Sequence, residues 1–262
     1  MEILVCVKQV PDTAEIKVDS GTNTVDASGA PKILNPFDAN AVEAAVQLKE
    51  EHGGNVTVLS MGTEQTKAVL KACISVGADK AVLLNDDLFK DSDTFATSYI
   101  LASAIKKLGS FDLILCGKQA IDGDSGQVGP QIAEHLGVAQ ITYASKIQYK
   151  DNRLVVNREH EDGYEIIMAK LPAVCIVVNT INTPRYATVK SKMAANKAKI
   201  VVLAAADLPE LDQTMIGLEG SPTKTIEVFT PPKKASGIKI KEGTGNESGI
   251  KLAKMLISER VI

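Results

Sequence analysis

The chain contains no tryptophan, and aromatic residues make up only 4% of its 262 residues. Proteins that bind single-stranded nucleic acid stack the bases on aromatic side chains, so this composition argues against a site of that kind. Charge of one sign is not in excess either, because 29 basic and 32 acidic residues give a formal net charge of −3. This balance gives no electrostatic support for binding nucleic acid or an anionic membrane.

Long hydrophobic runs are also missing, although hydrophobic residues make up 45% of the chain. No run approaches the roughly 20 residues that span a bilayer, so we expect no membrane insertion. Residues 1–7 read directly as a strand, without the basic head or cleavage site of a secretory signal. The cysteines are widely separated in apolar surroundings, which is typical of buried thiols in a reducing compartment; they are Cys6, Cys73, Cys116 and Cys175. We therefore expect a cytoplasmic protein.

Motifs for common catalytic chemistry are absent. The histidines, His52, His135 and His160, have no metal-ligand spacing to one another or to a cysteine, so no metal site is expected. There is no G-x-S-x-G nucleophile motif, and the glycine-rich loop after residue 116 reads neither as a P-loop nor as G-x-G-x-x-G. We expect no catalytic acid, base or nucleophile in this chain.

Apolar runs and helical segments alternate through the first part of the chain. Runs rich in Val, Ile and Leu suit strands buried on both faces and occur at residues 3–7, 56–61, 81–84, 113–116 and 173–178. Segments with the spacing of a helix lie between them at 38–51, 63–76 and 92–108. This alternation predicts the α/β class, with a doubly wound parallel sheet and a ligand site outside the carboxyl ends of its strands.

The pattern changes after residue 140. Residues 147–158 alternate around Asp151 and Asn152, which predicts a hairpin, and residues 164–170 predict a further strand. A helix over 187–198 and a strand over 200–204 follow, then a long segment with few apolar residues, including the prolines at 231 and 232, and last a helix over about 248–258. Asn246 or Ser248 is the expected cap of that helix. The long segment is too polar to bury itself, so it is expected to be flexible or to lie against a partner.

Residues 117–136 carry the clearest sign of a ligand site. A predicted strand (111–116) precedes them, and a helix follows in which Val128, Ile132, Ala133 and Leu136 recur at helical spacing. The backbone N–H groups of a first helical turn lack partners within the helix and lie at the positive end of its dipole. A nucleotide diphosphate is the ligand that suits this arrangement best.

The composition of this loop leaves a second interpretation open. Glycines that let a ligand approach the backbone closely recur along it, at Gly123, Gly126 and Gly129. Asp122 and Asp124, however, would repel phosphate. In an ordinary loop, Asp124 or Ser125 would simply cap the helix that follows.

A second candidate contact lies at residues 35–38, Asn-Pro-Phe-Asp, where the first long helix begins. Asp38 in this position predicts a structural helix cap. The alternative is a ligand contact, because the topology places this loop on the same rim of the sheet as the loop after residue 116.

Several motifs resemble those of the β subunit of electron transfer flavoproteins, in order and spacing, over most of the chain. They are Val7-Lys8-Gln9-Val10; Asn35-Pro36-Phe37 with Ala41-Val42-Glu43-Ala44-Ala45; Gly117-Lys118-Gln119-Ala120-Ile121-Asp122; Arg158-Glu159, Asp162-Gly163 and Lys170-Leu171-Pro172-Ala173; and Pro184-Arg185-Tyr186-Ala187-Thr188. The combination is specific, although no single motif would be.

The resemblance implies a heterodimer with an α subunit. Residues 1–186 would form a nucleotide-binding α/β domain of the adenine-nucleotide-hydrolase type, and residues 187–262 a docking helix and a C-terminal arm that wraps the α subunit. A redox FAD would belong chiefly to the α subunit. The β site would hold a second FAD, as in electron-bifurcating relatives, or AMP, as in the housekeeping carriers.

Matching positions imply two groups of nucleotide contacts. The first is Cys6, Asn35, Pro36, Phe37, Asp38 and Met61. The second is the loop and the start of its helix: Asp122, Gly123, Asp124, Ser125, Gly126, Gln127, Val128, Gly129, Pro130, Gln131 and Ala133. Backbone N–H groups there would hold phosphate, with Ser125 and Gln127 as side-chain donors, while Asp122 and Asp124 would organise the loop.

FAD is the cofactor that the resemblance favours for the β site. The loop over residues 122–130 has glycines where AMP-type relatives carry bulkier and more acidic neighbours, and residues 93–98 and 220–223 also look like the bifurcating group. Thr94 and Thr97 are then candidates to face the flavin. The alternative for both is a structural role as a helix cap and a first-turn residue.

The implied function is electron transfer in which the cofactor performs the chemistry. NADH would donate a hydride to the β-site FAD; one electron would go to ferredoxin or flavodoxin, and the other through the α-subunit FAD to a flavin dehydrogenase of the acyl-CoA or lactate type. A nucleotide-sensing module without redox work is the competing hypothesis.

Docking of the dehydrogenase would fall to Arg185, Tyr186, Val189 and Met193. Val189 stands where relatives have leucine, and Lys190 where many have proline. Alternatively, Val189 packs only on its own helix.

Overall fold

A computed structural model describes residues 1–12, 17–18, 25–26, 29–226 and 237–262. The chain divides into two compact units, Met1–Val228 and Phe229–Ile262. The helices are α1 (Pro36–His52), α2 (Lys67–Ser75), α3 (Thr94–Leu108), α4 (Val128–Leu136), α5 (Val189–Asn196) and α6 (Gly245–Ser258). Short 3-10 turns are η2 (Glu64–Thr66), η3 (Asp87–Phe89), η4 (Ala205–Asp207) and η5 (Gln213–Met215).

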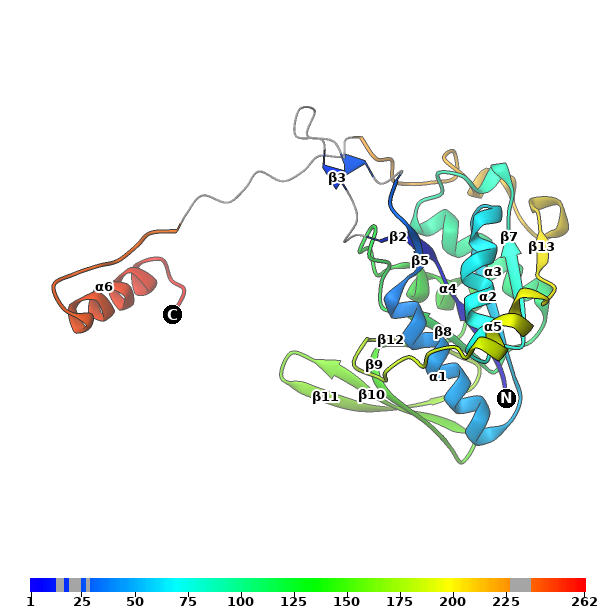
Figure 1. The fold of residues 1–262 in the computed structure, drawn as a ribbon, viewed down its shortest axis with the longest axis horizontal. Coiled ribbons are helices and arrows are strands. Elements are labelled where there is room, and N and C mark those ends of the chain that lie inside the picture. The colour runs from blue at the N-terminus through cyan, green and yellow to red at the C-terminus, as the bar shows by residue number, and fades with distance from the viewer. Residues whose placement is uncertain (13–16, 19–24, 27–28, 227–236) are drawn as a thin grey trace. The chain divides into compact units, whose positions relative to one another are not determined.

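One large sheet organises the first unit (Figure 1). Its strands are β1 (Glu2–Cys6), β6 (Asn55–Met61), β7 (Lys80–Leu84), β8 (Leu113–Gly117), β9 (Ala139–Lys150), β10 (Arg153–His160), β11 (Gly163–Lys170), β12 (Ala173–Val177) and β13 (Val201–Leu203). They lie in the order β11-β10-β9-β12-β8-β1-β6-β7-β13, and every neighbouring pair from β9 to β13 is parallel. The short strands β2 (Gln9–Pro11) and β5 (Lys32–Leu34), and β3 (Lys17–Val18) and β4 (Val25–Asp26), form two small antiparallel pairs.

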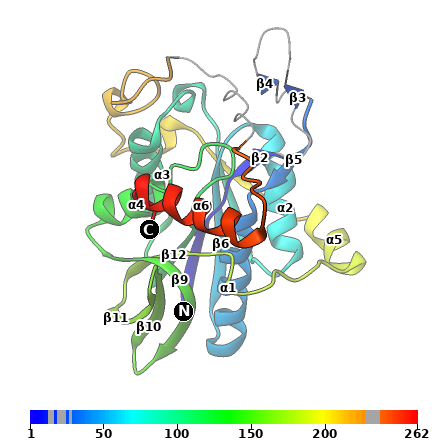
Figure 2. The same ribbon diagram turned by 90° about the vertical axis from the view of Figure 1, so that its left-hand side faces the viewer.

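Helices cover both faces of this sheet, as Figure 2 shows with α1 and α2 on one side and α3 and α4 on the other. Alternate residues of a strand point to opposite faces. Accordingly, Ile3 and Val5 of β1 pack in one hydrophobic core with α1 and α2, while Leu4 packs in the other core with α3 and α4. Both faces are therefore apolar, which explains the continuous Val, Ile and Leu runs of the strands.

The predicted α/β class and doubly wound parallel sheet are confirmed. The predicted hairpin is also present, because β9 and β10 pair around Asp151 and Asn152. Both residues have positive φ, 51° and 57°, which is the conformation of a tight two-residue hairpin turn. The predicted strand over 164–170 is β11, which pairs antiparallel with β10.

Helix ends differ from the predictions in several places. Asp38 does not cap α1, which begins two residues earlier at Pro36 with Asn35 in the N-cap position. Neither Asp124 nor Ser125 caps α4, because Gln127 occupies that position and makes no side-chain capping bond. Thr94 is the first residue of α3 rather than its cap.

The last helix has the strongest cap. Thr244 and Glu247 form a capping box, so neither Asn246 nor Ser248 is the N-cap, and α6 begins at Gly245. Cap assignments depend on where the chain leaves the helical conformation, and a run of several polar residues does not fix that point.

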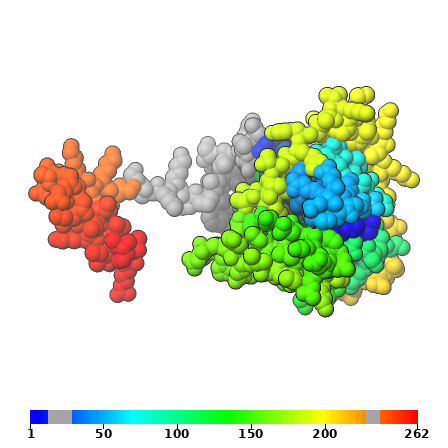
Figure 3. Space-filling model, turned by 90° about the horizontal axis from the view of Figure 1, so that it is seen from below, coloured from blue at the N-terminus to red at the C-terminus, as the bar shows by residue number. Residues whose placement is uncertain are grey.

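Helix α5 and strand β13 belong to the first unit, where β13 pairs with β7. The atoms of the α5 segment, in yellow in Figure 3, lie on the outside of that unit. Of the predicted C-terminal arm, residues 227–236 lie outside the described residues. The functional division after residue 186 stays a prediction. Within the described ranges, none of the helices combines the length and apolar character that crossing a membrane requires.

A substitution at Gly77 would test how closely α1 packs against the turn before β7. Its φ is 127°, and a Cβ added there would stand 2.8 Å from Cγ1 of the buried Val46. Gly109 has nearly the same φ, 124°, but nothing within 4 Å of an added Cβ. We expect Gly77→Ala to lower the free energy of unfolding by about 1–3 kcal/mol more than Gly109→Ala, because both substitutions share the backbone strain but only the first overpacks a core. Urea unfolding of both variants measures this difference, and equal losses would contradict the assignment.

Candidate functional site

A cleft of about 580 Å³ opens at the carboxyl ends of β1, β6 and β8. Cys6, Met61 and Gly117, the last residues of these three strands, line it. This is the edge that the doubly wound topology predicts for a ligand. The volume lies in the range of about 300–1,000 Å³ that is usual for small-molecule and cofactor sites.

The loop between β8 and α4 forms an arch along this cleft. Asp124 and Gly126 have left-handed φ values of 48° and 62°. In the described part of the chain, the backbone N–H groups of Ser125, Gly126 and Gln127 donate to no other group. They lie just before the N-terminus of α4, where the helix dipole favours negative charge. The arch therefore offers free donors to an anionic ligand.

Both carboxylates of the arch are engaged by other side chains. The Lys8 ammonium binds both oxygens of Asp122, at 2.9 and 2.7 Å. The Gln119 side-chain amide donates to Asp124 Oδ1 at 2.8 Å. These contacts reduce the repulsion that the two carboxylates would exert on phosphate. Lys8 lies 114 positions before Asp122, so no local pattern in the sequence could reveal this pair.

Asn35 ties the arch to the start of α1. Its side-chain NH2 group donates to the Gln119 carbonyl at 2.8 Å, and its side-chain oxygen Oδ1 accepts from the Ile121 N–H at 3.2 Å. Asn35 is only 1% exposed. An amide that donates and accepts at once, shielded from water, fixes the loop more firmly than one exposed bond would. The arch is thus held from both sides, by Lys8 and by Asn35.

Asp38 is a buried carboxyl group that lines the same cleft. Its Oδ2 accepts from the Lys8 backbone N–H at 2.8 Å. Gly117 packs directly beside it, since an added Cβ would stand 2.6 Å from the Phe37 carbonyl carbon and overlap Asp38 Oδ1. Burial raises the pKa of Asp38 to about 7, although hydrogen bonds from the Lys8 and Gly117 backbone and from Asn35 oppose this rise.

The start of α3 also lines the cleft. The Thr94 hydroxyl donates to Gln127 Oε1 at 2.8 Å, which joins α3 to the arch. Among the described residues, the Gln127 side-chain amide donates to no other group. Asp93 caps α3 by accepting from the Ala96 N–H. Its other carboxylate oxygen accepts from the N–H and the hydroxyl of Thr223, at 2.9 and 2.7 Å.

The segment after residue 216 contacts the start of α3 as well. Ser221 Oγ accepts from the Asp93 N–H at 2.8 Å and donates to the Gly217 carbonyl at 2.6 Å. Thr225 lines the cleft. The structure therefore brings together two segments that lie far apart in the sequence, residues 93–98 and 220–223. Each of them resembles the bifurcating relatives in its sequence.

Most of the expected cofactor contacts line this cleft: Cys6, Asn35, Asp38, Met61, Thr94, Thr97, Asp122, Gly123, Asp124, Ser125, Gly126, Gln127, Val128 and Gly129. Pro36, Phe37, Pro130, Gln131 and Ala133 do not line it. Ala133 is buried in the core that α4 forms with the sheet. Three further residues line the cleft to which the sequence analysis assigned no contact with a ligand: Lys8, Asp93 and Gln119.

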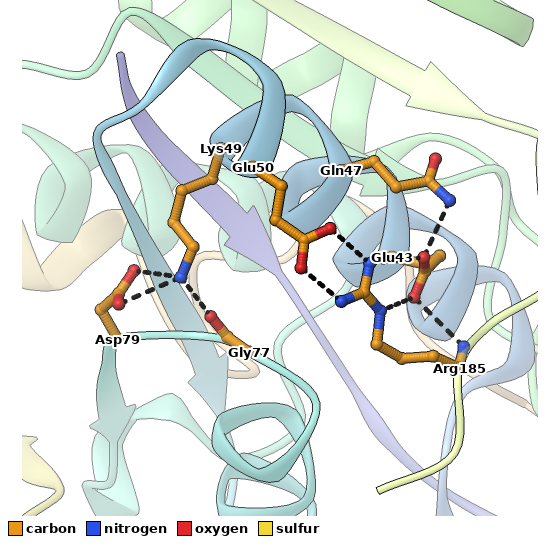
Figure 4. A network of polar contacts seen from close by, with 7 residues as sticks. All are labelled: Glu43, Gln47, Lys49, Glu50, Gly77, Asp79 and Arg185. Carbon is orange, nitrogen blue, oxygen red and sulfur yellow. Dashed lines mark hydrogen bonds and ion pairs between the residues drawn. The ribbon is translucent and has the colours of Figure 1, made fainter.

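The expected docking residues lie elsewhere on the first unit. Tyr186, Val189 and Met193 are highly exposed, at 98%, 77% and 63%. Arg185 instead binds α1, with its guanidinium between Glu43 and Glu50 (Figure 4). Figure 4 also shows Lys49 of the same helix bound to Asp79 and to the Gly77 carbonyl.

Comparison with known proteins gives one consistent family. Residues 22–208 match the family described as "Electron transfer flavoprotein domain". The chain is 47% identical to the electron transfer flavoprotein subunit beta of Megasphaera elsdenii, over 100% of both chains. It is 44% identical to the caffeyl-CoA reductase-Etf complex subunit CarD of Acetobacterium woodii and 42% identical to the acryloyl-CoA reductase electron transfer subunit gamma of Anaerotignum propionicum, again over 100% of both chains.

A largely parallel sheet with helices on both faces and a cleft at the carboxyl ends of its strands defines the doubly wound α/β class of protein. Within that class, the chain belongs to the electron transfer flavoprotein family, as a β subunit. The resemblance noted from its sequence motifs is therefore confirmed.

The ionisation of Asp38 predicts a pH dependence of stability. Because the folded pKa is about 7 and the ordinary value is 3.8, the folded chain binds this proton more tightly than the unfolded chain. Stability from this group is present below about pH 4 and is lost as the pH rises toward 7. We expect the free energy of unfolding of Asp38→Asn, relative to the unsubstituted chain, to rise by roughly 2 kcal/mol between pH 5 and pH 8.

Urea unfolding at four pH values checks this expectation. Asp151→Asn, which removes a carboxylate from the exposed hairpin turn, is the control and should show no comparable trend. A pH-independent difference for Asp38→Asn would show that Asp38 stays ionised in the fold.

Proposed function

We propose that this chain binds FAD in the cleft and works in a heterodimer with an electron transfer flavoprotein α subunit. One observation carries the proposal: Ser125, Gly126 and Gln127, whose backbone N–H groups donate to nothing in the described part of the chain, line a cleft where Lys8 and Gln119 already engage the carboxylates of the arch. Backbone donors at a helix start are suited to a diphosphate. When bound, the flavin would supply the hydride and electron chemistry, and the chain would position it.

Two features of the cleft support FAD over AMP. The cleft extends from the arch to Thr94, Thr97 and Thr225, which leaves space beyond the residues that would hold phosphate. Gly123 also lines it and has open space around an added Cβ. Both features support a ligand longer than a mononucleotide, with AMP as the alternative.

We further propose an electron-bifurcating role. NADH is the proposed hydride donor, ferredoxin or flavodoxin the low-potential acceptor, and a flavin dehydrogenase, reached through a second FAD in the α subunit, the other acceptor. The joined segments 93–98 and 220–223 support this subtype through their resemblance to bifurcating relatives. The names of two relatives, which refer to caffeyl-CoA reductase and acryloyl-CoA reductase, favour an acyl-CoA dehydrogenase type over a lactate dehydrogenase type.

The nucleotides in the purified heterodimer test this proposal directly. Acid extraction and chromatography should yield two FAD for each α and β chain, and the complex should be yellow. One FAD and one AMP would instead identify a non-bifurcating carrier. A complex without flavin would favour a nucleotide-sensing role.

The arch itself is tested by substituting Lys8. We expect Lys8→Met to weaken FAD binding at the β site about tenfold, because it leaves the Asp122 carboxylate unpaired beside the proposed diphosphate. Lys8→Met with Asp122→Asn should restore most of the affinity, since the double variant removes the repelling charge. Titration of the flavin-depleted heterodimer with FAD measures both. If the double variant binds as weakly as the single one, Lys8 acts in some other way than by neutralising Asp122.

A further inference from the structure

Two cysteine side chains lie next to each other where β1 and β8 reach the cleft. Cys6 of β1 pairs with Cys116 of β8 in the register of these parallel neighbours. Both side chains belong to the core on the face of the sheet that α3 and α4 cover. Neighbouring strands are about 4.7–4.9 Å apart, which lies within the range of roughly 4.4–6.8 Å that separates the Cα atoms of a disulfide. The two residues are therefore placed to be joined by a disulfide.

The thiols of this pair are in contact in the reduced protein. A hydrogen bond to Cys6, together with burial, holds the pKa of Cys116 well above its usual range. The other two cysteines, Cys73 of α2 and Cys175 of β12, belong to the core on the other face of the sheet. Cys175 pairs with Leu115 in the sheet and not with Cys116, so its side chain points away from the pair.

Both members of the pair line the cleft. Cys6 is 7% exposed and Cys116 is 5% exposed, whereas Cys175 is fully buried. A small oxidant that enters the cleft therefore reaches this pair and not the thiol of the opposite core. A cofactor in the cleft would cover the same residues. Because thiol oxidation follows exposure, we expect it to depend on whether the cleft is filled.

The pair also stands at the base of the two segments that shape the cleft. Lys8, which holds the arch through Asp122, follows Cys6 by two positions. The first turn of α4 packs on the other cysteine, since a Cβ added at Gly129 would stand 3.3 Å from Cys116 Cβ. A disulfide brings its Cβ atoms to about 3.5–4.5 Å, closer than the usual strand spacing. Forming it would draw the ends of β1 and β8 together and displace the arch.

We propose that Cys6 and Cys116 form a reversible disulfide when the cleft is empty, and that this disulfide lowers the affinity of the cleft for its cofactor. The disulfide itself is inferred from the strand register and the shared contact, whereas its effect on FAD rests on the proposed function. Disulfides whose geometry is forced by their surroundings are the more easily reduced ones. A dithiol reductant should therefore reverse this one.

Hydrogen peroxide is the oxidant considered for this reaction. The sulfur of one cysteine attacks a peroxide oxygen, the O–O bond breaks, and a sulfenic acid forms while the thiol proton leaves with the hydroxide as water. The sulfur of the second cysteine then attacks the first sulfur. The S–S bond forms, the S–O bond breaks, and a second water leaves. Two thiols and one peroxide thus give one disulfide and two waters, with sulfur oxidised and peroxide oxygen reduced.

The test uses the heterodimer depleted of flavin at the β site. It is treated with hydrogen peroxide, and N-ethylmaleimide then blocks the remaining thiols. Digestion with trypsin in the absence of reductant should give peptide 1–8 linked to peptide 108–118, identified by mass spectrometry. Titration with FAD should show binding about tenfold weaker than in the reduced heterodimer, and dithiothreitol should restore it. With FAD bound beforehand, the linked peptide should form about tenfold more slowly.

Matched variants assign these effects to the pair. Cys116→Ser should give no linked peptide, and its FAD affinity should agree within about twofold before and after peroxide. Cys6→Ser should behave in the same way and serves if the first variant does not fold. Cys175→Ser, which removes a thiol of the other core, should form the linked peptide and lose affinity as the unsubstituted chain does.

Three outcomes would overturn the inference while leaving the proposed function intact. They are the absence of the linked peptide, the same FAD affinity with and without the disulfide, and an equal loss of affinity after peroxide in Cys116→Ser. A reduced heterodimer that binds no FAD at the β site would instead contradict the proposed function and, with it, the effect of the disulfide on FAD. The linked peptide would still show in that case that the disulfide forms.

Discussion

The cleft depends on a polar junction between the start of α1 and the arch after β8. The Asn35 side chain donates to the Gln119 carbonyl and accepts from the Ile121 N–H, and the Lys8 ammonium binds the Asp122 carboxylate. Without these contacts, nothing in the described part of the chain would hold a loop with two carboxylates and several glycines in a conformation that leaves three N–H groups without an acceptor. Free backbone donors are costly unless a ligand or water binds them. The junction therefore holds in place three backbone N–H groups for which the described part of the chain supplies no acceptor.

The layers of the fold could be predicted from the sequence, because the central strands β1, β6, β8 and β12 are buried on both faces and helices of apolar spacing alternate with them. The runs at 3–7, 56–61 and 113–116 became β1, β6 and β8 with ends within two residues of those expected. The order of the strands could not be predicted, since it depends on pairing between distant residues. Caps were also wrong, as at Thr244, because adjacent polar residues compete for the same role.

The position of the site could be predicted, but not how its charges are balanced. Topology alone brings the ends of β1, β6 and β8 together, and the glycines of the arch indicate where a ligand could approach. The pairing of Lys8 with Asp122, and of Asp93 with Thr223, joins residues more than 100 positions apart. No periodicity or local motif encodes such a contact. For that reason the two aspartates of the arch looked like an obstacle in the sequence, whereas in the structure each has a partner.

Helix α1 connects the cleft to the segment that leads into α5. Its first turn carries Asp38 in the cleft, while Glu43 and Glu50 further along it hold Arg185. Between them, Asn40 donates to Asn182 at 2.9 Å and fixes the same returning segment. A helix is stiff over this length, so the cleft at one end of α1 and the segment bound further along it keep a defined separation.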